Sequence, residues 1–251
     1  MIATGTTISI TRRDLAKMFD QSILRPAKES STSVIQATAH DAIKDSYRSL
    51  VVYPRRIPLV KGLLAGSGVL TAAVCDFPHA TESTEVRKLM VKKGLERGAD
   101  EIDIVTLHER LLEGVYEEFE QDIREVTQAM GGKILKLILE VDHLNEELIG
   151  EATRRIANVA REVKTARLIA KTKTGFADGK FPNIEAVKII RKTLEETGQY
   201  ARTLEELGNG LVAIKASGGI RTLDEILQLR KEGVHIIGIG NGKAVLEQIN
   251  T

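Results

Sequence analysis

The 251-residue sequence contains no tryptophan, and aromatic residues make up only 4% of it. So few aromatic side chains do not provide the stacking surface with which proteins hold single-stranded nucleic acid. The formal net charge of +1 likewise gives no reason to expect nucleic acid or a membrane surface as the main partner.

Cysteine is nearly absent too, since Cys75 is the only one. A single cysteine forms no internal disulfide and is typical of a reducing compartment, so we expect a cytoplasmic protein. Its apolar neighbours favour a buried, unreactive thiol over a nucleophile. Long apolar runs are also missing. None reaches the roughly 18 residues of a membrane helix, and residues 1–5 do not have the pattern of a secretory signal.

What the sequence does contain is a regular alternation of strand-like and helix-like apolar patterns. With 42% hydrophobic residues, the chain can bury a sizeable core. The predicted strands cover residues 18–24, 49–53, 69–77, 101–105, 134–141, 166–170, 211–214 and 235–239. The predicted helices cover residues 30–47, 57–64, 82–97, 109–130, 146–163, 184–197, 222–232 and 243–249, after a short helix within residues 1–17.

Eight strand–helix units in roughly 250 residues match the size of a (β/α)8 barrel. An open, doubly wound sheet is the alternative, because periodicity does not show whether a sheet closes. No linker, low-complexity segment or strong repeat divides the chain. We therefore predict one α/β domain over residues 1–251, a TIM barrel with a short N-terminal helical lead-in.

Two of the predicted strands end in a lysine that glycine soon follows. Lys171 begins the segment Lys-Thr-Lys-Thr-Gly-Phe, and Lys215 begins Lys-Ala-Ser-Gly-Gly. Burial lowers the pKa of a lysine, and the neutral amine is the form that attacks a carbonyl carbon. The pattern of Lys171 and Lys215 predicts that one cation tunes the other, beside a site for phosphate. The alternative is that both lysines bind phosphate as cations.

In a (β/α)8 barrel the active site lies at the C-terminal ends of the strands. Those ends carry Asp20, Asp76, Asp103, Glu140, Lys171, Lys215, Gly238 and Gly240. Charges inside a barrel are unfavourable unless they are paired, so we predict a network of opposite charges. Glu101 and Asp103 share one face of their strand, and Asp103 lies deeper. It is predicted either to act in catalysis or only to pair with a lysine.

Glycines follow the last two strands, at Gly218, Gly219, Gly238 and Gly240. Glycines before a helix allow backbone N–H groups to approach an anion. The loops after strands seven and eight are also the usual phosphate site of these barrels. Together with Gly175, they predict a phosphate site.

Metal and cofactor motifs are missing from the sequence. The five histidines show no HExxH pattern, no nucleophile elbow is visible, and no GxGxxG follows the first strands. His79 could touch substrate from its loop, but a solvated or capping role is favoured. His235 begins a strand, at the end of a barrel opposite the active site. We predict neither a metal ion nor a cofactor.

Several motifs, in order from about residue 20 to residue 241, resemble those of the deoxyribose-phosphate aldolases, which are class I (Schiff-base) aldolases. The two lysine segments are the most specific. The others are Asp-Gln-Ser-Ile-Leu-Arg from Asp20, Val-Tyr-Pro from Val52, Asp-Phe-Pro-His from Asp76 and Gly-Ala-Asp-Glu-Ile-Asp from Gly98. The resemblance implies cleavage of 2-deoxy-D-ribose 5-phosphate to glyceraldehyde 3-phosphate and acetaldehyde, and a homo-oligomer, dimer or tetramer.

The resemblance also implies roles for individual residues. Lys171 matches the lysine that forms the Schiff base, Lys215 the lysine that lowers its pKa, and Asp103 the carboxylate of the proton relay. The residues that it implies for substrate binding are Asp20, Thr172, Gly175, Gly218, Gly219, Gly238 and Asn241.

This sequence departs from the family pattern at a few positions. Lys173 stands where serine is frequent, Gly240-Asn241 where a pair of serines is frequent, and Val51 where cysteine is frequent. From a loop, Lys173 could reach the phosphate. Some members end in a tyrosine that assists proton transfer, whereas this chain ends Gln-Ile-Asn-Thr. The alternatives are another Schiff-base lyase or acyl-transferring relative, and a silent barrel that only binds a sugar phosphate.

Overall fold

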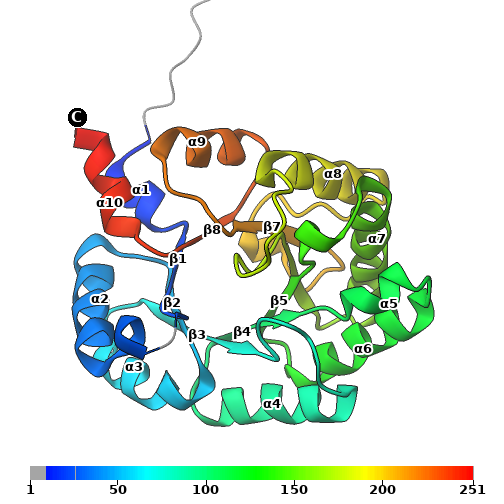
Figure 1. Ribbon diagram of the computed structural model, residues 1–251, viewed down its shortest axis with the longest axis horizontal. Helices are drawn as coiled ribbons and strands as arrows, with labels where there is room; N and C mark the ends of the chain where they lie inside the picture. Colours follow the sequence, from blue (N-terminus) through cyan, green and yellow to red (C-terminus); the bar gives the residue numbers. More distant parts are fainter. Residues whose placement is uncertain (1–9, 26, 251) are drawn as a thin grey trace, which may run out of the picture.

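A computed structural model describes residues 10–25 and 27–250 of the chain. Its eight strands are parallel and form a closed barrel, because each pairs with the next along the chain and β1 pairs with β8 (Figure 1). Closure confirms the predicted (β/α)8 barrel over the open sheet. The strands are β1 (Phe19–Ser22), β2 (Ser49–Val52), β3 (Leu70–Cys75), β4 (Glu101–Val105), β5 (Ile134–Ile138), β6 (Arg167–Lys171), β7 (Val212–Ser217) and β8 (Ile236–Ile239).

Helices surround the barrel as an outer ring (Figure 1). They are α1 (Arg12–Ala16), α2 (Thr32–Asp45), α3 (Ile57–Leu63), α4 (Thr84–Glu96), α5 (His108–Leu112), α6 (Tyr116–Ala129), α7 (Glu146–Glu162), α8 (Asn183–Glu196), α9 (Leu223–Lys231) and α10 (Gly242–Glu247). Short 3₁₀ helices cover Ala27–Ser30, Pro54–Arg56, Val141–His143, Leu204–Glu206 and Gln248–Asn250. Within the described residues, no helix has the length and apolar character needed to cross a membrane.

The predicted lead-in helix is present as α1, which the side chain of Thr11 caps by accepting from the N–H of Asp14. Residues 1–9 of the lead-in lie outside the described residues. The single helix predicted over residues 109–130 is wrong, because the chain forms α5 and α6 instead. Gly114 separates them with φ of +74°, a left-handed conformation that ends a helix.

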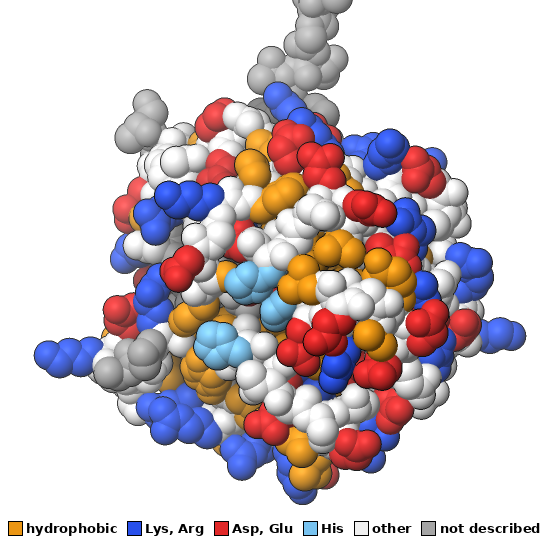
Figure 2. All heavy atoms as spheres, turned by 45° about the vertical axis from the view of Figure 1, so that its right-hand side comes forward, with side chains coloured by type: hydrophobic (Ala, Val, Ile, Leu, Met, Phe, Trp, Pro, Cys, Tyr) orange, Lys and Arg blue, Asp and Glu red, His pale blue; other side chains and the backbone are white. Residues whose placement is uncertain are grey.

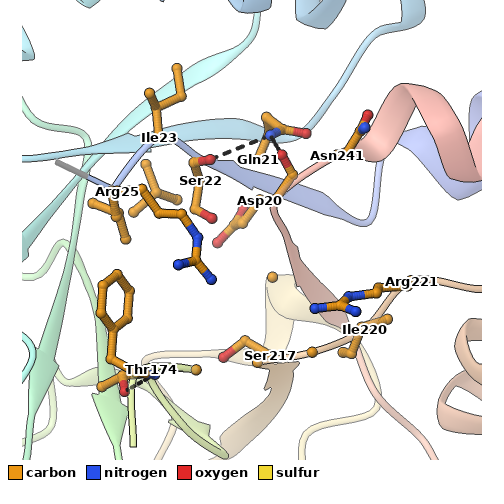
Figure 3. A pocket seen from close by; sticks show the side chains of 18 of the residues that line it. Asp20, Gln21, Ser22, Ile23, Arg25, Thr174, Ser217, Ile220, Arg221 and Asn241 are labelled. Atoms are coloured by element: carbon orange, nitrogen blue, oxygen red, sulfur yellow. Dashed lines mark hydrogen bonds between the residues drawn. The ribbon is translucent and has the colours of Figure 1, made fainter. Parts of the chain in front are cut away.

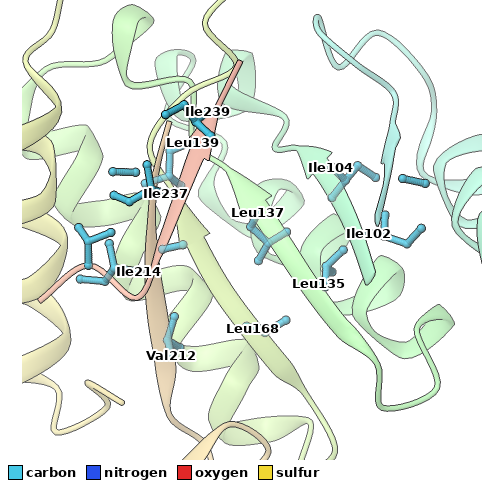
Figure 4. Packing of buried hydrophobic residues seen from close by; sticks show 14 of the residues in the cluster. Ile102, Ile104, Leu135, Leu137, Leu139, Leu168, Val212, Ile214, Ile237 and Ile239 are labelled. Carbon is cyan, nitrogen blue, oxygen red and sulfur yellow. The ribbon is translucent and has the colours of Figure 1, made fainter. Parts of the chain in front are cut away.

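Apolar strand residues face outward and pack under the helices. Ile102 and Ile104 of β4 and Leu135 and Leu137 of β5 belong to one buried cluster (Figure 4). Since strand side chains alternate in direction, the intervening Asp103 and Lys136 point into the barrel, where they lie in register. The amphipathic pattern of the strands therefore places charged residues inside.

The barrel interior is layered along its axis. A small apolar cluster fills the end where the strands begin, with Ile134, Ile169, Ala213 and Ile236 as its strand residues. One layer further along β5, β6 and β7 come Lys136, Lys171 and Lys215. The charged layer therefore rests on an apolar floor and lies toward the C-terminal ends of the strands.

Candidate active site

A pocket of about 550 Å³ opens at the C-terminal ends of β1, β6, β7 and β8 and extends toward α2 (Figure 3). Most of the residues predicted for the site line it. They are Asp20, Lys171, Gly175, Lys215, Gly218, Gly219, Gly238 and Asn241. The barrel thus gathers residues that lie up to 221 positions apart in the sequence.

Lys171 and Lys215 are register partners on β6 and β7. Their Nζ atoms donate to the same oxygen, Oδ2 of Asp103, at 2.9 Å and 2.8 Å. Sharing one oxygen holds the two amino groups within the roughly 4–6 Å at which one positive charge disfavours another. Lys215 also donates to Oδ2 of Asp20 at 2.6 Å.

A further cation lies beneath this group. Nζ of Lys136 forms ion pairs with Asp20 at 2.8 Å, Glu101 at 2.7 Å and Asp103 at 3.0 Å. Arg48 bonds Asp20 at 2.9 Å and is also paired with Glu101. The predicted network of opposite charges is therefore present, and it extends deeper than the strand ends.

The network does not balance if every member is charged. Among the described residues, its ion pairs join the cations Arg48, Lys136, Lys171 and Lys215 to the carboxylates Asp20, Glu101 and Asp103. A buried charge without compensation is unfavourable, so one cation is in excess. Lys171 has a single carboxylate partner, whereas Lys136 has three, and arginine does not lose its proton. The charge count therefore favours the neutral amine at Lys171.

The pKa shifts agree with this count. Burial, assisted by the charge of Lys215, lowers the pKa of Lys171 to about 8, although Asp103 acts in the opposite direction. Burial alone would raise the pKa of Asp103, but Lys136, Lys171 and Lys215 hold it below its ordinary value. Near neutral pH, Asp103 is an anion while part of Lys171 is a free amine.

Sequence reasoning missed Lys136 and Arg48. Lys136 did carry a signal, because it is a lone lysine in the apolar strand Ile-Leu-Lys-Leu-Ile and is the register partner of Asp103 on the preceding strand, β4. Arg48 precedes β2 and carried none, since its role depends on Asp20 and Glu101 from two other strands.

Removal of the Lys136 charge should destabilise the protein. In Lys136→Met, three buried carboxylates lose a shared partner, so we expect the free energy of unfolding to fall by about 3–5 kcal/mol. Urea unfolding at pH 7 measures this loss. Lys88→Met is the control, because its partly exposed ion pair with Glu125 is screened by solvent and should contribute little to stability. Equal losses in the two variants would contradict the role of Lys136.

Three of the predicted substrate-binding side chains are engaged within the protein. Asn241 caps α10, where its Oδ1 accepts from the N–H of Ala244 at 3.2 Å. Asp20 is fully buried and bonded to Lys215, Arg48 and Ser49, so it lines the pocket while holding other side chains. Thr172 does not line the pocket. Neighbouring side chains on a strand point in opposite directions, so that of Thr172 points away from that of Lys171. Its hydroxyl donates to Oδ1 of Asn183 at 2.7 Å and accepts from the N–H of Ser217.

The glycines of the pocket allow close contact between two loops. At Gly175, φ is +80°, and an added Cβ would lie 2.9 Å from Cα of Gly218. At Gly238, an added Cβ would lie 2.5 Å from Cβ of Ser217 and 3.2 Å from Cε of Lys215. A larger residue at either position would displace the wall of the pocket.

Three other charged residues near the strand ends lie outside the pocket. Lys173 bonds Asp142 and the carbonyl of Phe181, both at 2.8 Å, so the expectation that it reaches a phosphate is wrong. Asp76 is paired with Arg87, and Glu140 bonds Thr174. These residues fix loops and helices around the barrel.

The remaining titratable candidates do not form a reactive cluster. Histidine side chains gather on one face of the molecule (Figure 2). His108 and His143 stack with ring centroids 5.0 Å apart. Among the described residues, no group of three His, Cys, Asp or Glu side chains could hold a metal ion. His79 does not line the pocket, and Nδ1 of His235 accepts from the backbone N–H of Ile214 at the other end of the barrel.

Cys75 is buried as predicted, and burial raises its pKa to about 12.

Comparison with known proteins points to one family. Over 237 residues, the chain is 31% identical to the deoxyribose-phosphate aldolase of Clostridium perfringens (strain 13 / Type A), covering 94% of this chain and 96% of that protein. A structure from Coccidioides immitis, provisionally assigned as a deoxyribose-phosphate aldolase, has a TM-score of 0.84 and 25% identity over 96% of this chain and 88% of that one. The deoxyribose phosphate aldolase of Aeropyrum pernix, described as having a unique tetrameric structure, has a TM-score of 0.79 and 23% identity. The match covers 96% of this chain and 93% of that one. No protein-family model matches the chain.

Proposed function

Because this chain belongs to the deoxyribose-phosphate aldolase family, we propose that it reversibly cleaves 2-deoxy-D-ribose 5-phosphate to D-glyceraldehyde 3-phosphate and acetaldehyde. The observation that carries the chemistry is the lysine pair on Asp103, with the pKa of Lys171 lowered to about 8. A buried amine beside a second cation is what Schiff-base catalysis requires.

In the proposed mechanism, the free amine of Lys171 adds to the aldehyde carbon of the open-chain sugar. Loss of water gives an iminium, which draws electrons toward nitrogen. The hydroxyl on C3 then loses its proton, the C2–C3 bond breaks, and C3 becomes the aldehyde of glyceraldehyde 3-phosphate. The electron pair of the broken bond forms an enamine, which is protonated at C2 and hydrolysed to acetaldehyde and free Lys171.

Asp103 and Lys215 are the proposed carriers of protons, together with water. Asp103 lies within hydrogen-bond distance of both lysines, so it can pass a proton between Lys171 and Lys215. Nζ of Lys215 donates to Oδ2 of Asp20 at 2.6 Å. Asp20, from β1, therefore holds the second lysine in position inside the barrel. We assign Asp20 this positioning role in addition to any contact with the sugar.

The substrate's phosphate is proposed to bind at the glycine loops, at Gly175, Gly218, Gly219, Gly238 and Asn241. Positive φ at Gly175, Gly218 and Gly219 orients successive backbone groups in ways that favour an anion. Thr172 supports this region by joining β6 to β7. Beyond the substrate, we propose a cytoplasmic homo-oligomer, dimer or tetramer, in keeping with the tetrameric description of the Aeropyrum pernix enzyme.

Two alternatives make different use of the same pocket. Another Schiff-base lyase or acyl-transferring relative would keep the lysine chemistry on a different carbonyl compound. A silent binder would need no poised amine, and phosphate-binding cations would not be buried against Asp103 and Asp20. The buried lysine pair therefore favours a lyase.

Borohydride trapping tests the proposed function. The protein is incubated with 2-deoxyribose 5-phosphate or acetaldehyde, reduced, digested and examined by mass spectrometry. We expect a stable adduct on Lys171. Trapping should become faster as pH rises through about 8, because the amine fraction grows in that direction. An adduct on Lys215 would exchange the two roles, and no adduct from folded protein would favour a different carbonyl substrate or a silent binder.

A further inference from the structure

The outer part of the pocket holds two arginines that the lysine network does not use. Arg25 follows β1 and Arg221 follows β7, and both line the pocket. Their side chains reach toward one another from opposite sides of its opening (Figure 3). The pocket therefore carries positive charge at two depths, with the lysines on its floor and the guanidinium groups near its mouth.

Neither guanidinium is engaged in a strong interaction. Within residues 10–25 and 27–250, the side chain of Arg221 has no hydrogen-bond or ion-pair partner. Its hydrogen bonds are made by the backbone, which donates to Glu225 and accepts from Gln248. Arg25 lies 3.9 Å from Oε2 of Glu29, beyond ordinary hydrogen-bond length, and both of these side chains are about two-thirds exposed. Each arginine thus has donors to offer a ligand.

An aromatic row lies beside the guanidinium of Arg25. Its guanidinium lies over the ring of Phe176, 5.7 Å from the centroid. The rings of Phe176 and Phe77 pack in a T-shaped arrangement with centroids 5.3 Å apart. Those of Phe77 and Tyr53 do the same with centroids 6.4 Å apart. A cation over an aromatic face is attracted to it, so the ring of Phe176 favours this orientation of Arg25 without using its hydrogen-bond donors. Phe176 also directly follows Gly175, which packs on Gly218.

We propose that Arg25 is a specificity-determining residue that binds the substrate's phosphate from the β1 side, opposite the glycine loops and Arg221. The proposal rests on the proposed function for the identity of the substrate. The phosphate lies at the other end of a five-carbon sugar from the aldehyde that reacts with Lys171, so it must extend away from the lysine layer toward the mouth. A planar guanidinium matches a phosphate with two parallel hydrogen bonds. On binding, Arg25 would exchange its weak contact with Glu29 for hydrogen bonds to the phosphate.

Two measurements separate this proposal from the proposed function. Inorganic phosphate is titrated into wild type and variants to give a dissociation constant, and turnover is measured with 2-deoxyribose 5-phosphate and with 2-deoxyribose. For Arg25→Ala we expect phosphate affinity, and kcat/KM for the phosphorylated sugar, to fall by about 10- to 100-fold. The value of kcat/KM for 2-deoxyribose should stay within about twofold, because no phosphate contact is lost.

Matched variants identify the cause of any loss. Arg25→Lys keeps a cation that can lie over Phe176 but loses the two parallel hydrogen bonds, so its loss of phosphate affinity should be smaller than that of Arg25→Ala. Lys28→Ala removes one exposed positive charge nearby but outside the pocket, and should change affinity by less than about twofold. Phe176→Leu removes the ring under Arg25 and should give an intermediate loss.

The outcomes distinguish the two hypotheses. Equal phosphate affinity in wild type and Arg25→Ala would overturn the role of Arg25, even if the enzyme cleaves the phosphorylated sugar. Equal losses in Arg25→Ala and Lys28→Ala would overturn it as well, because general electrostatics would then be sufficient. Loss of phosphate affinity confined to Arg25→Ala, in a protein that does not cleave the sugar, would support the site and refute the proposed function.

Discussion

Lys171→Met is expected to abolish cleavage of 2-deoxyribose 5-phosphate, with a loss of about 10⁴-fold or more in kcat. Methionine fills a similar space but cannot form an iminium, and no other amine in the pocket is held in the same position. The fold should survive, because Asp103 keeps Lys136 and Lys215 as partners. Turnover measured with a coupled assay, and melting followed by circular dichroism, give the two readouts.

Lys173→Met is the matched control. Lys173 is also buried, lies two positions further along the chain and has one carboxylate partner, Asp142. It lies outside the pocket, so the variant should retain turnover within about tenfold even if it loses some stability. If Lys171→Met kept substantial activity, or if the two variants lost activity equally, Lys171 would not be the nucleophile.

Lys215→Met should lower kcat by about 10²- to 10⁴-fold. The variant loses the positive charge that disfavours a proton on Lys171, and Asp103 is left to stabilise the protonated form. Both changes raise the pKa of Lys171 above about 8. Because the reactive form is the amine, the rate of iminium formation should then reach its midpoint at a higher pH than in wild type.

The shape of the pH profile separates the two contributions of Lys215. Rates of borohydride trapping are measured from pH 6 to 10.5 in both proteins. Recovery of the variant at high pH would assign Lys215 an electrostatic role, whereas a uniformly low rate would assign it to proton transfer. If Lys215→Met were trapped at the wild-type rate, with the same midpoint pH, Lys215 would have no role in the reaction.

The proposed division of labour explains why so many charges are buried together. Three carboxylates hold three cations and leave the fourth, Lys171, free to lose its proton. The same carboxylates stabilise the fold only while those cations remain, so stability and reactivity depend on one network. Loss of Arg48, Lys136 or Lys215 should therefore affect both properties, whereas loss of Lys171, the cation in excess, should affect reactivity with little effect on stability.

Much of the site could be predicted from the sequence because its signals are local. A lysine or aspartate that ends an apolar strand stands out within a few residues, and glycines before a helix are equally visible. Thr172 shows the limit of such reasoning, since it adjoins Lys171 but its side chain lies on the other side of β6. Gly114 divides a predicted helix in two, because a glycine within a helical pattern does not by itself reveal the positive φ that it adopts.

The sequence by itself determined the alternation of strands and helices, the lysines at the strand ends and the glycine loops, because each depends on residues close together in the chain. Only the tertiary structure decided that β1 closes on β8, that Lys136 joins three carboxylates, and that Arg25 and Arg221 face one pocket. These facts join residues from distant strands, and no spacing along the chain encodes which distant charges will meet inside a closed barrel.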